Sequence, residues 1–256
     1  MKVVILAGGL GTRLTEETTV KPKPMVEIGG RPILWHIMKI YGHYGVKDFG
    51  IAMGYKSDVI KDYFINYYYQ QSDLTINLKT GSISTHEANR EDWQVFLSDT
   101  GAATQTGGRI KRMKDWLGNA PFMLTYGDGV SNIDINKLLQ FHKSQGKLVT
   151  LTAVRPPSRF GGLSIENNKV INFKEKPQIG EGWINGGFFV IEPEALEFID
   201  NDSTLWEREP LERLSHEGQL AAYEHDGFWQ CMDTIRDVNT LENLWQTGSA
   251  PWKLWN

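Results

Sequence analysis

Two groups of residues in this 256-residue chain have the types and spacing for phosphate chemistry. In the first, Gly8, Gly9 and Gly11 follow an apolar run, so backbone amides can approach an anion without an intervening side chain. Arg13 and Lys23 follow closely, and their positive charges suit a polyphosphate. The glycines alone are equally compatible with an ordinary strand-to-helix turn, and they fit neither the dinucleotide fingerprint nor the P-loop.

Two aspartates form the second group. Asp128 stands between two glycines after an apolar run, and Asp233 lies just before an expected helix. Magnesium prefers a few carboxylate oxygens together with substrate phosphates, so these side chains could hold one ion if the fold brought them together. The residues themselves leave a plainer interpretation open, in which Asp128 is a turn residue and Asp233 a helix N-cap.

The segment FKEKPQ offers a carboxylate and an ammonium group for a sugar phosphate. Glu175 could accept hydrogen bonds from sugar hydroxyls and Lys176 could meet the phosphate. Asn185 and Gly186 would continue this ring of polar contacts. An exposed charged loop is the alternative, since charged side chains mostly lie solvated at the surface.

These groups need an α/β framework to position them. Residues 3–7 form a continuous apolar run that predicts a strand buried on both faces. Apolar spacing then predicts helices at 32–44, at 57–67 with Ser57 as the N-cap, and at 134–145. It predicts further strands at 48–53, at 122–126, at 148–154 and from residue 184. This alternation favours a Rossmann-like three-layer α/β sandwich with a mostly parallel mixed sheet.

Two polar stretches interrupt the alternation. Residues 72–108 and 155–183 predict inserted hairpins and loops, which are candidate substrate walls because ligands bind beyond the carboxyl ends of parallel strands. We expect residues 1–256 to form a single domain with an aromatic tail at 245–256. The three tryptophans of this tail favour a homo-oligomer, since tryptophan is enriched at interfaces.

Composition excludes several classes of partner. The net charge of −4 argues against nucleic acid, because proteins that bind it present a basic surface. The single cysteine, Cys231, excludes an internal disulfide and suits a reducing compartment. The apolar run at 3–7 is too short for a signal-peptide core or a membrane span. We therefore expect a cytoplasmic protein with no nucleic-acid and no membrane partner.

Motifs along the whole chain resemble those of sugar-phosphate nucleotidyltransferases, which join a nucleoside triphosphate to a sugar 1-phosphate and release pyrophosphate. The longest is LAGGLGTRLTEETTVKPKPMVEIGGRPIL, near the N-terminus. The others are DTG followed by TGGRIKR, and then TYGDGV, INGGFF, FWQCMDT and APWKLWN. They are most similar to the branch of the family that transfers a cytidylyl group from CTP to glucose 1-phosphate, giving CDP-glucose.

The resemblance implies a role for each matching residue. It places Asp128 and Asp233 on Mg²⁺, Arg13 on the departing pyrophosphate and Lys23 near the α-phosphate. The implied nucleotide contacts are Leu6, Ala7, Gly8, Gly9, Leu10, Gly11, Thr12, Arg13, Lys23, Thr104, Arg109 and Gly127. The implied sugar-phosphate contacts are Gly162, Glu175, Lys176, Asn185 and Gly186. Positioning and charge neutralisation supply such catalysis, and no general base is needed because the sugar phosphate is already an anion.

Other activities stay open on the same scaffold. A thymidylyl- or uridylyltransferase would differ in the segment at 99–112, which selects the base. A non-catalytic nucleotide-sugar sensor could dispense with Arg13, Lys23 or either aspartate, and this chain has them all. The resemblance favours a homo-oligomeric enzyme that supplies CDP-sugars for surface polysaccharide such as O-antigen.

Overall fold

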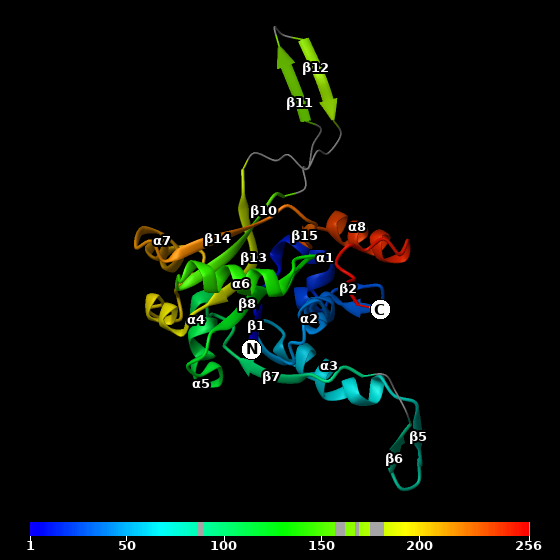
Figure 1. Cartoon of the computed structure of the whole chain (residues 1–256). Helices are drawn as coiled ribbons and strands as arrows, with labels where there is room; N and C mark the ends of the chain where they lie inside the picture. The colour runs from blue at the N-terminus through cyan, green and yellow to red at the C-terminus, as the bar shows by residue number, and fades with distance from the viewer. Residues whose placement is uncertain (87–89, 157–161, 167–168, 175–181, 256) are drawn as a thin grey trace.

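A seven-stranded mixed sheet forms the centre of the molecule (Figure 1). The structure is a computed structural model that describes residues 1–86, 90–156, 162–166, 169–174 and 182–255. In spatial order the strands are β14 (Leu220–His225), β10 (Val149–Val154), β13 (Ile184–Ile191), β8 (Phe122–Tyr126), β1 (Lys2–Ala7), β4 (Asp48–Met53) and β7 (Gln94–Asp99). Only β13 runs antiparallel to its neighbours in this sheet, so the sheet is mostly parallel.

Alternate residues of β1 belong to two hydrophobic cores, one on each face of the sheet. Val3 and Ile5 pack in one core, and Val4 and Leu6 pack in the other. The first core includes residues of α2 (Ile33–His43), α3 (Ser57–Gln70), α6 (Ile135–Gln145) and α8 (Ile235–Gln246). The second includes residues of α4 (Thr106–Arg112), α5 (Lys114–Leu117), η3 (Pro193–Phe198) and α7 (Glu209–His216). The predicted three-layer α/β sandwich with a mostly parallel mixed sheet is confirmed.

Most expected elements form where their local sequence favours them. β4 and β8 have the predicted bounds, and Asp134 caps α6 by accepting a hydrogen bond from the Lys137 amide. The expected cap at Ser57 is wrong. Ser57 is instead the first residue of α3, and Lys56 precedes it in the left-handed region with a φ of 50° and no side-chain cap.

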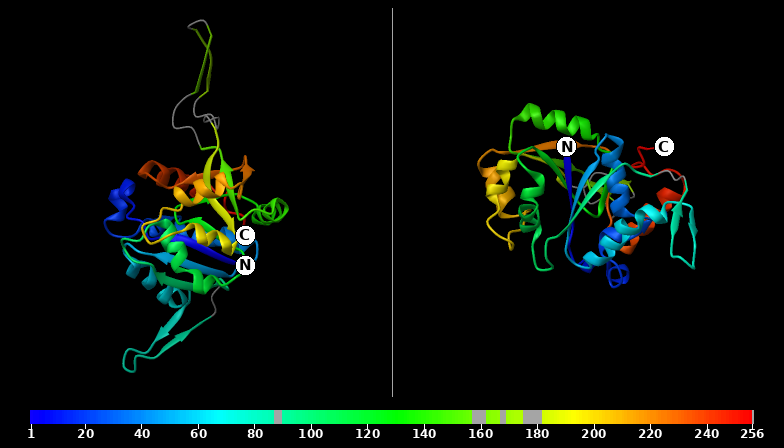
Figure 2. Two further views of the ribbon diagram at one scale, coloured as in Figure 1. Left: turned by 90° about the vertical axis from the view of Figure 1, so that its left-hand side faces the viewer. Right: turned by 90° about the horizontal axis from the view of Figure 1, so that it is seen from below.

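The two polar stretches each contribute a hairpin that projects from the body of the molecule (Figures 1 and 2). These are β5–β6 (Leu74–Ile76 and Ile83–Thr85) and β11–β12 (Gly162–Glu166 and Lys169–Lys174). The first stretch is not wholly an insertion, however, because it also contains β7, which pairs with β4 at the edge of the central sheet. In the parts of the chain that the structure describes, no helix is long and apolar enough to cross a membrane.

The aromatic tail packs within its own chain rather than projecting from it. Trp252 is 1% exposed, and its indole Nε1 donates to Nδ1 of the buried His36 at 3.4 Å. Trp245 meets the same imidazole edge to face, with 4.7 Å between ring centroids. These tryptophans therefore pack against residues of their own chain, so the tail by itself gives no reason to expect a subunit interface.

Candidate functional site

The glycine turn after β1 lines a cavity of about 980 Å³ at the carboxyl ends of the parallel strands. Gly11 has a φ of +65°, which favours glycine, and its carbonyl accepts hydrogen bonds from the Leu14 amide and the Thr18 hydroxyl. These bonds lead the chain into η1 (Thr12–Leu14) and α1 (Thr15–Thr18). No heavy atom lies within 4 Å of where a Cβ on Gly9 would stand, so a ligand can reach the backbone there.

Arg109, on α4, contacts this turn. The residue is 4% exposed, and its guanidinium donates to the carbonyls of Gly8, Met53 and Gly101 and to the Thr100 hydroxyl, over 2.6–3.0 Å. A methyl group on Gly8 would lie 2.2 Å from the Arg109 Cζ. Burial lowers the pKa of Arg109 from its ordinary value. Arg109 therefore ties the glycine turn to the ends of β4 and β7, and glycine at position 8 makes room for it.

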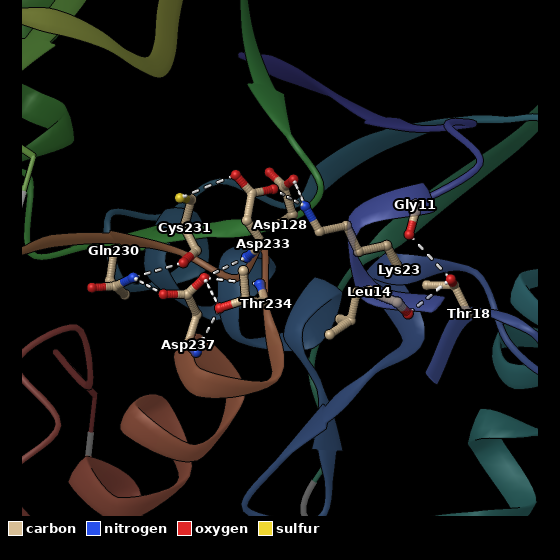
Figure 3. Close-up of polar contacts among 10 residues, drawn as sticks. All are labelled: Gly11, Leu14, Thr18, Lys23, Asp128, Gln230, Cys231, Asp233, Thr234 and Asp237. Atoms are coloured by element: carbon tan, nitrogen blue, oxygen red, sulfur yellow. Dashed lines mark hydrogen bonds and ion pairs between the residues drawn. The ribbon is translucent and has the colours of Figure 1, made fainter. Parts of the chain in front are cut away.

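Lys23 reaches the cavity from η2 (Lys23–Met25), a short turn with buried prolines on both sides of the lysine. Its ammonium Nζ lies 2.5 Å from Asp128 Oδ2 and 2.5 Å from Asp233 Oδ1 (Figure 3). Burial lowers the pKa of Lys23, but the two carboxylates more than offset this and hold the pKa above its usual value. One positive charge thus bridges two negative ones.

Pairing between two short strands brings the aspartates together. β9 (Gly129–Ser131) directly follows Asp128, and β15 (Trp229–Cys231) comes shortly before Asp233. The two strands pair antiparallel, with Gly129 opposite Cys231, and the Met232 amide donates to the Asp128 carbonyl at 2.8 Å. Asp128 and Asp233, which are far apart in the sequence, therefore lie together near the end of β8 in the central sheet.

The start of α8 fixes Asp233. Thr234 is the N-cap and forms a capping box with Asp237, whose carboxylate also accepts from the Asp233 amide at 3.0 Å. Asp233 itself therefore does not cap the helix, and its side chain lines the cavity. The neighbouring Cys231 thiol has its pKa raised to about 12 by burial and by Asp233 and Asp128, so it stays neutral.

The carboxylate pair fits a divalent cation. Two oxygens from separate carboxylates already converge on one positive charge, and oxygen ligands are those that hard divalent cations prefer. Among the described residues no third carboxylate, histidine or cysteine joins them in a metal-binding group. The remaining ligands would therefore come from substrate phosphates and water.

The structure brings most of the predicted site residues to this cavity. Those that line it are Leu6, Ala7, Gly8, Gly9, Leu10, Gly11, Thr12, Lys23, Thr104, Arg109, Gly127, Asp128, Asn185 and Asp233. Gly186 lies beside it, with its carbonyl accepting from the Trp229 indole at 2.7 Å. Gly162 is the first residue of the projecting β11. Glu175 and Lys176 are outside the described residues, as is the side chain of Arg13, whose backbone belongs to η1.

Several cavity residues were not anticipated from the sequence. They are Pro24, Ala102, Ala103, Gln105, Thr106, Tyr126, Glu207, Trp229 and Cys231. Five of them lie inside motifs that resemble the family, namely Pro24, Thr106, Tyr126, Trp229 and Cys231, so the motifs were a usable signal. Glu207 lies in an irregular segment between η3 and α7, and no motif marks it.

Comparison with known proteins agrees with this geometry. The family model described as nucleotidyl transferase matches residues 2–250. The chain belongs to the nucleotidyl transferase family. It is 55% identical to the glucose-1-phosphate cytidylyltransferases of Salmonella typhi and Salmonella typhimurium, over 100% of each chain. Its fold is similar to that of HddC from Yersinia pseudotuberculosis complexed with GMP-PN, with a TM-score of 0.70 and 24% identity over 95% of this chain and 99% of that one.

Membership of the nucleotidyl transferase family also bears on the cations and the substrates. Enzymes of this family generally use a divalent metal, and their substrates are a nucleotide and a sugar phosphate. The bridged pair of carboxylates and the glycine turn are the parts of this chain that suit those two requirements.

Proposed function

We propose that this protein is a glucose-1-phosphate cytidylyltransferase, which converts CTP and α-D-glucose 1-phosphate into CDP-glucose and pyrophosphate. The observation that carries this proposal is the 55% identity over the full length of enzymes with that name. Its product would supply CDP-sugars for surface polysaccharide such as O-antigen. We take residues 1–256 as a single nucleotidyltransferase domain.

A phosphate oxygen of glucose 1-phosphate attacks the α-phosphorus of CTP, and pyrophosphate leaves in line. The attacking oxygen is already ionised, so positioning and charge neutralisation are what the protein contributes. Backbone amides of the turn from Gly8 to Gly11 face the nucleotide phosphates, Arg13 offsets charge on the departing pyrophosphate, and Lys23 steadies the α-phosphate region. Arg109 supports these contacts by holding the Gly8 carbonyl.

Asp128 and Asp233 hold Mg²⁺ in this proposal. When bound, the ion neutralises negative charge on the phosphates. Lys23 Nζ lies between the two carboxylates, so a cation held by Asp128 and Asp233 would compete with the ammonium group for the same oxygens. Thr104, Arg109 and Gly127 are the proposed nucleotide contacts beyond the turn. Gly162, Glu175, Lys176, Asn185 and Gly186 are the proposed sugar-phosphate contacts.

Pyrophosphate release from the purified protein tests the proposal. CTP, UTP and dTTP would each be paired with a small panel of sugar 1-phosphates, in EDTA and after Mg²⁺ is restored. We expect release with CTP and glucose 1-phosphate, dependent on the metal. Preference for UTP or dTTP would instead identify a uridylyl- or thymidylyltransferase, and no release with any pair would favour a nucleotide-sugar sensor. An Asp128→Asn variant that kept full activity would contradict the metal site, with Asp92→Asn, whose side chain is 86% exposed, as a surface control.

We also propose that the enzyme acts in the cytoplasm, where its nucleotide substrate is made, and that it assembles as a homo-oligomer. The support for assembly is not the tail but α3 and the β5–β6 hairpin, which leave apolar side chains exposed, among them Ile65, Ile76 and Leu78. Light scattering after gel filtration would measure the mass. A monomer that persists at high protein concentration would contradict the proposal.

A further inference from the structure

The segment at 202–207 packs against the start of α4. The Gln105 amide donates to the Asp202 carbonyl at 2.8 Å, and the Gly107 amide donates to the Thr204 carbonyl at 3.0 Å. A Cβ on Gly108 would lie 2.6 Å from the Asp202 Cα, and one on Gly107 would lie 2.8 Å from the Thr204 carbonyl oxygen. The glycine pair of the TGGRIKR motif therefore allows this segment to approach closely, which is a structural use of residues that suggested a ligand contact.

This packing places the Glu207 carboxylate in the wall of the cavity. The preceding Trp206 is fully buried and anchors the segment in the core. The Thr106 hydroxyl accepts from the Trp206 amide at 2.9 Å and donates to Glu207 Oε2 at 2.6 Å. One carboxylate oxygen is thereby oriented, and the group keeps capacity to accept further hydrogen bonds, because a carboxylate offers about four acceptor positions.

Two neutral polar groups accompany Glu207 in the same wall. The Tyr126 hydroxyl accepts from Asn185 Nδ2 at 3.4 Å. Burial and the nearby Glu207 carboxylate raise the pKa of Tyr126 well above its usual range, so the hydroxyl stays protonated. Glu207, Tyr126 and Asn185 come from the 202–207 segment, β8 and β13, and together offer an acceptor, a hydroxyl and an amide.

Glu207 is a third carboxylate of the cavity, separate from the Asp128 and Asp233 pair that the Lys23 ammonium bridges. Elsewhere the cavity offers the Lys23 ammonium and the open backbone of the glycine turn, which suit anions. Phosphate beside Glu207 would be repelled, so the part of the substrates that meets it must donate hydrogen bonds. Under the proposed reaction such donors are the glucose hydroxyls, the ribose hydroxyls and the cytosine amino group.

Sheet order favours the glucose hydroxyls. The glycine turn follows β1, and Arg109 ties it to the ends of β4 and β7 on one side. Tyr126 and Asn185 lie at the same end of the sheet on β8 and β13, which stand on the other side of β1. A nucleotide on the side of β1, β4 and β7 leaves the side of β8 and β13 to the second substrate.

We propose that Glu207 is a specificity-determining residue for the sugar phosphate, and that its carboxylate, beside Tyr126 and Asn185, accepts hydrogen bonds from hydroxyl groups of the hexose. This inference rests on the proposed function. The Glu207 side chain is exposed at the cavity wall, and hydrogen bonds to a charged acceptor are stronger than those to a neutral one. A sugar lacking the hydroxyl that Glu207 meets should therefore react more slowly by about 10-fold.

The test compares Glu207→Gln with wild type, using glucose 1-phosphate and its 2-, 3-, 4- and 6-deoxy analogues. Glu209→Gln is the matched control, because Glu209 is an exposed carboxylate nearby on α7 and outside the cavity. We expect Glu207→Gln to raise KM for glucose 1-phosphate by about 10-fold, to leave KM for CTP within about 2-fold, and to lose discrimination against one deoxy analogue. Tyr126→Phe should also raise KM for glucose 1-phosphate. It takes the place of Glu207→Gln in the test if circular dichroism shows that Glu207→Gln does not fold.

Four results would overturn the inference. Kinetics of Glu207→Gln equal to those of Glu209→Gln would show that the carboxylate meets no substrate. A raised KM for CTP with a reduced preference for CTP over UTP would assign Glu207 to the base, and a raised KM for CTP with that preference intact would assign it to the ribose. Wild-type protein that is inactive with CTP and glucose 1-phosphate would refute the proposed function and this inference together, whereas the other results leave the proposed function intact.

Discussion

Replacing Lys23 with methionine tests whether one ammonium group neutralises both carboxylates in the free enzyme. The ammonium lies 2.5 Å from an oxygen of each, and the side chains of Lys23, Asp128 and Asp233 are 12%, 29% and 16% exposed. Removing one partner of a buried ion pair costs about 3–5 kcal/mol, and partial exposure of the carboxylates reduces this. We expect Lys23→Met to lower the free energy of unfolding by about 2–3 kcal/mol without metal.

A divalent cation should restore much of that loss, because it binds the folded carboxylate pair and not the unfolded chain. In a chain of this size 1 kcal/mol corresponds to about 2–4 °C in Tm, so the variant should melt about 4–12 °C lower in EDTA. Added Mg²⁺ should raise the Tm of Lys23→Met more than that of wild type, whose lysine competes for the same oxygens. Differential scanning fluorimetry measures the Tm, and Mn²⁺ titration followed by electron paramagnetic resonance measures metal binding without turnover.

Lys21→Met is the matched control for this variant. Lys21 meets Glu17 at 3.9 Å and Glu27 at 3.7 Å near the surface, so its loss should cost no more than about 1 kcal/mol. Equal Tm values for Lys23→Met and Lys21→Met in EDTA would refute the role of Lys23 between the carboxylates. An equal rise in Tm on adding Mg²⁺ to wild type and to Lys23→Met would refute it as well. In saturating Mg²⁺ we still expect kcat of Lys23→Met to fall by about 100-fold, since the ammonium near the α-phosphate is gone.

Three further predictions concern the surroundings of the site. Gly8→Ala should lower the free energy of unfolding by about 1–3 kcal/mol in urea titrations because its methyl group would collide with Arg109, whereas Gly9→Ala has open space and should match wild type. Burial lowers the pKa of His36 to about 4, so its contribution to stability is complete above pH 6.5 and should decline by about 3 kcal/mol as pH falls from 6.5 to 4. Equal pH dependence of unfolding in wild type and His36→Gln would contradict this. Cys231→Ser should keep kcat within about 3-fold, since a thiol with a pKa of about 12 is no nucleophile, and a near-complete loss of turnover would contradict that assignment.

Local sequence patterns predicted the elements whose environment depends on nearby residues. The apolar run of β1 anticipated burial on both faces, and β4 and β8 have the predicted bounds. Local patterns failed where a longer contact decides the outcome. The stretch at 72–108 looked polar throughout, yet β7 within it joins the sheet because β4 offers it a parallel edge.

The carboxylate pair shows the same limit at the site. Asp128 and Asp233 were identified individually from their motifs, but only the pairing of β9 with β15 brings them within reach of one cation. Arg109 shows the converse. Its motif pointed to a nucleotide contact, and the fold adds that its guanidinium donates to the Gly8 carbonyl of the glycine turn and to groups at the ends of β4 and β7. A motif identifies a residue as important without saying whether that residue touches the ligand or holds the group that does.

The charge pattern of the cavity carries information that no single motif contains. Lys23 and the amides of the glycine turn lie in the region that suits phosphates, while Glu207, Tyr126 and Asn185 offer hydrogen bonds to neutral groups in another part of the wall. The proposed substrates have the matching arrangement, since their phosphates meet at the reacting centre and their hydroxyl groups lie to the outside. Glu207 joins this pattern only because Gly107 and Gly108 let its segment pack against α4, so the sugar side of the site depends on glycines that make no sugar contact.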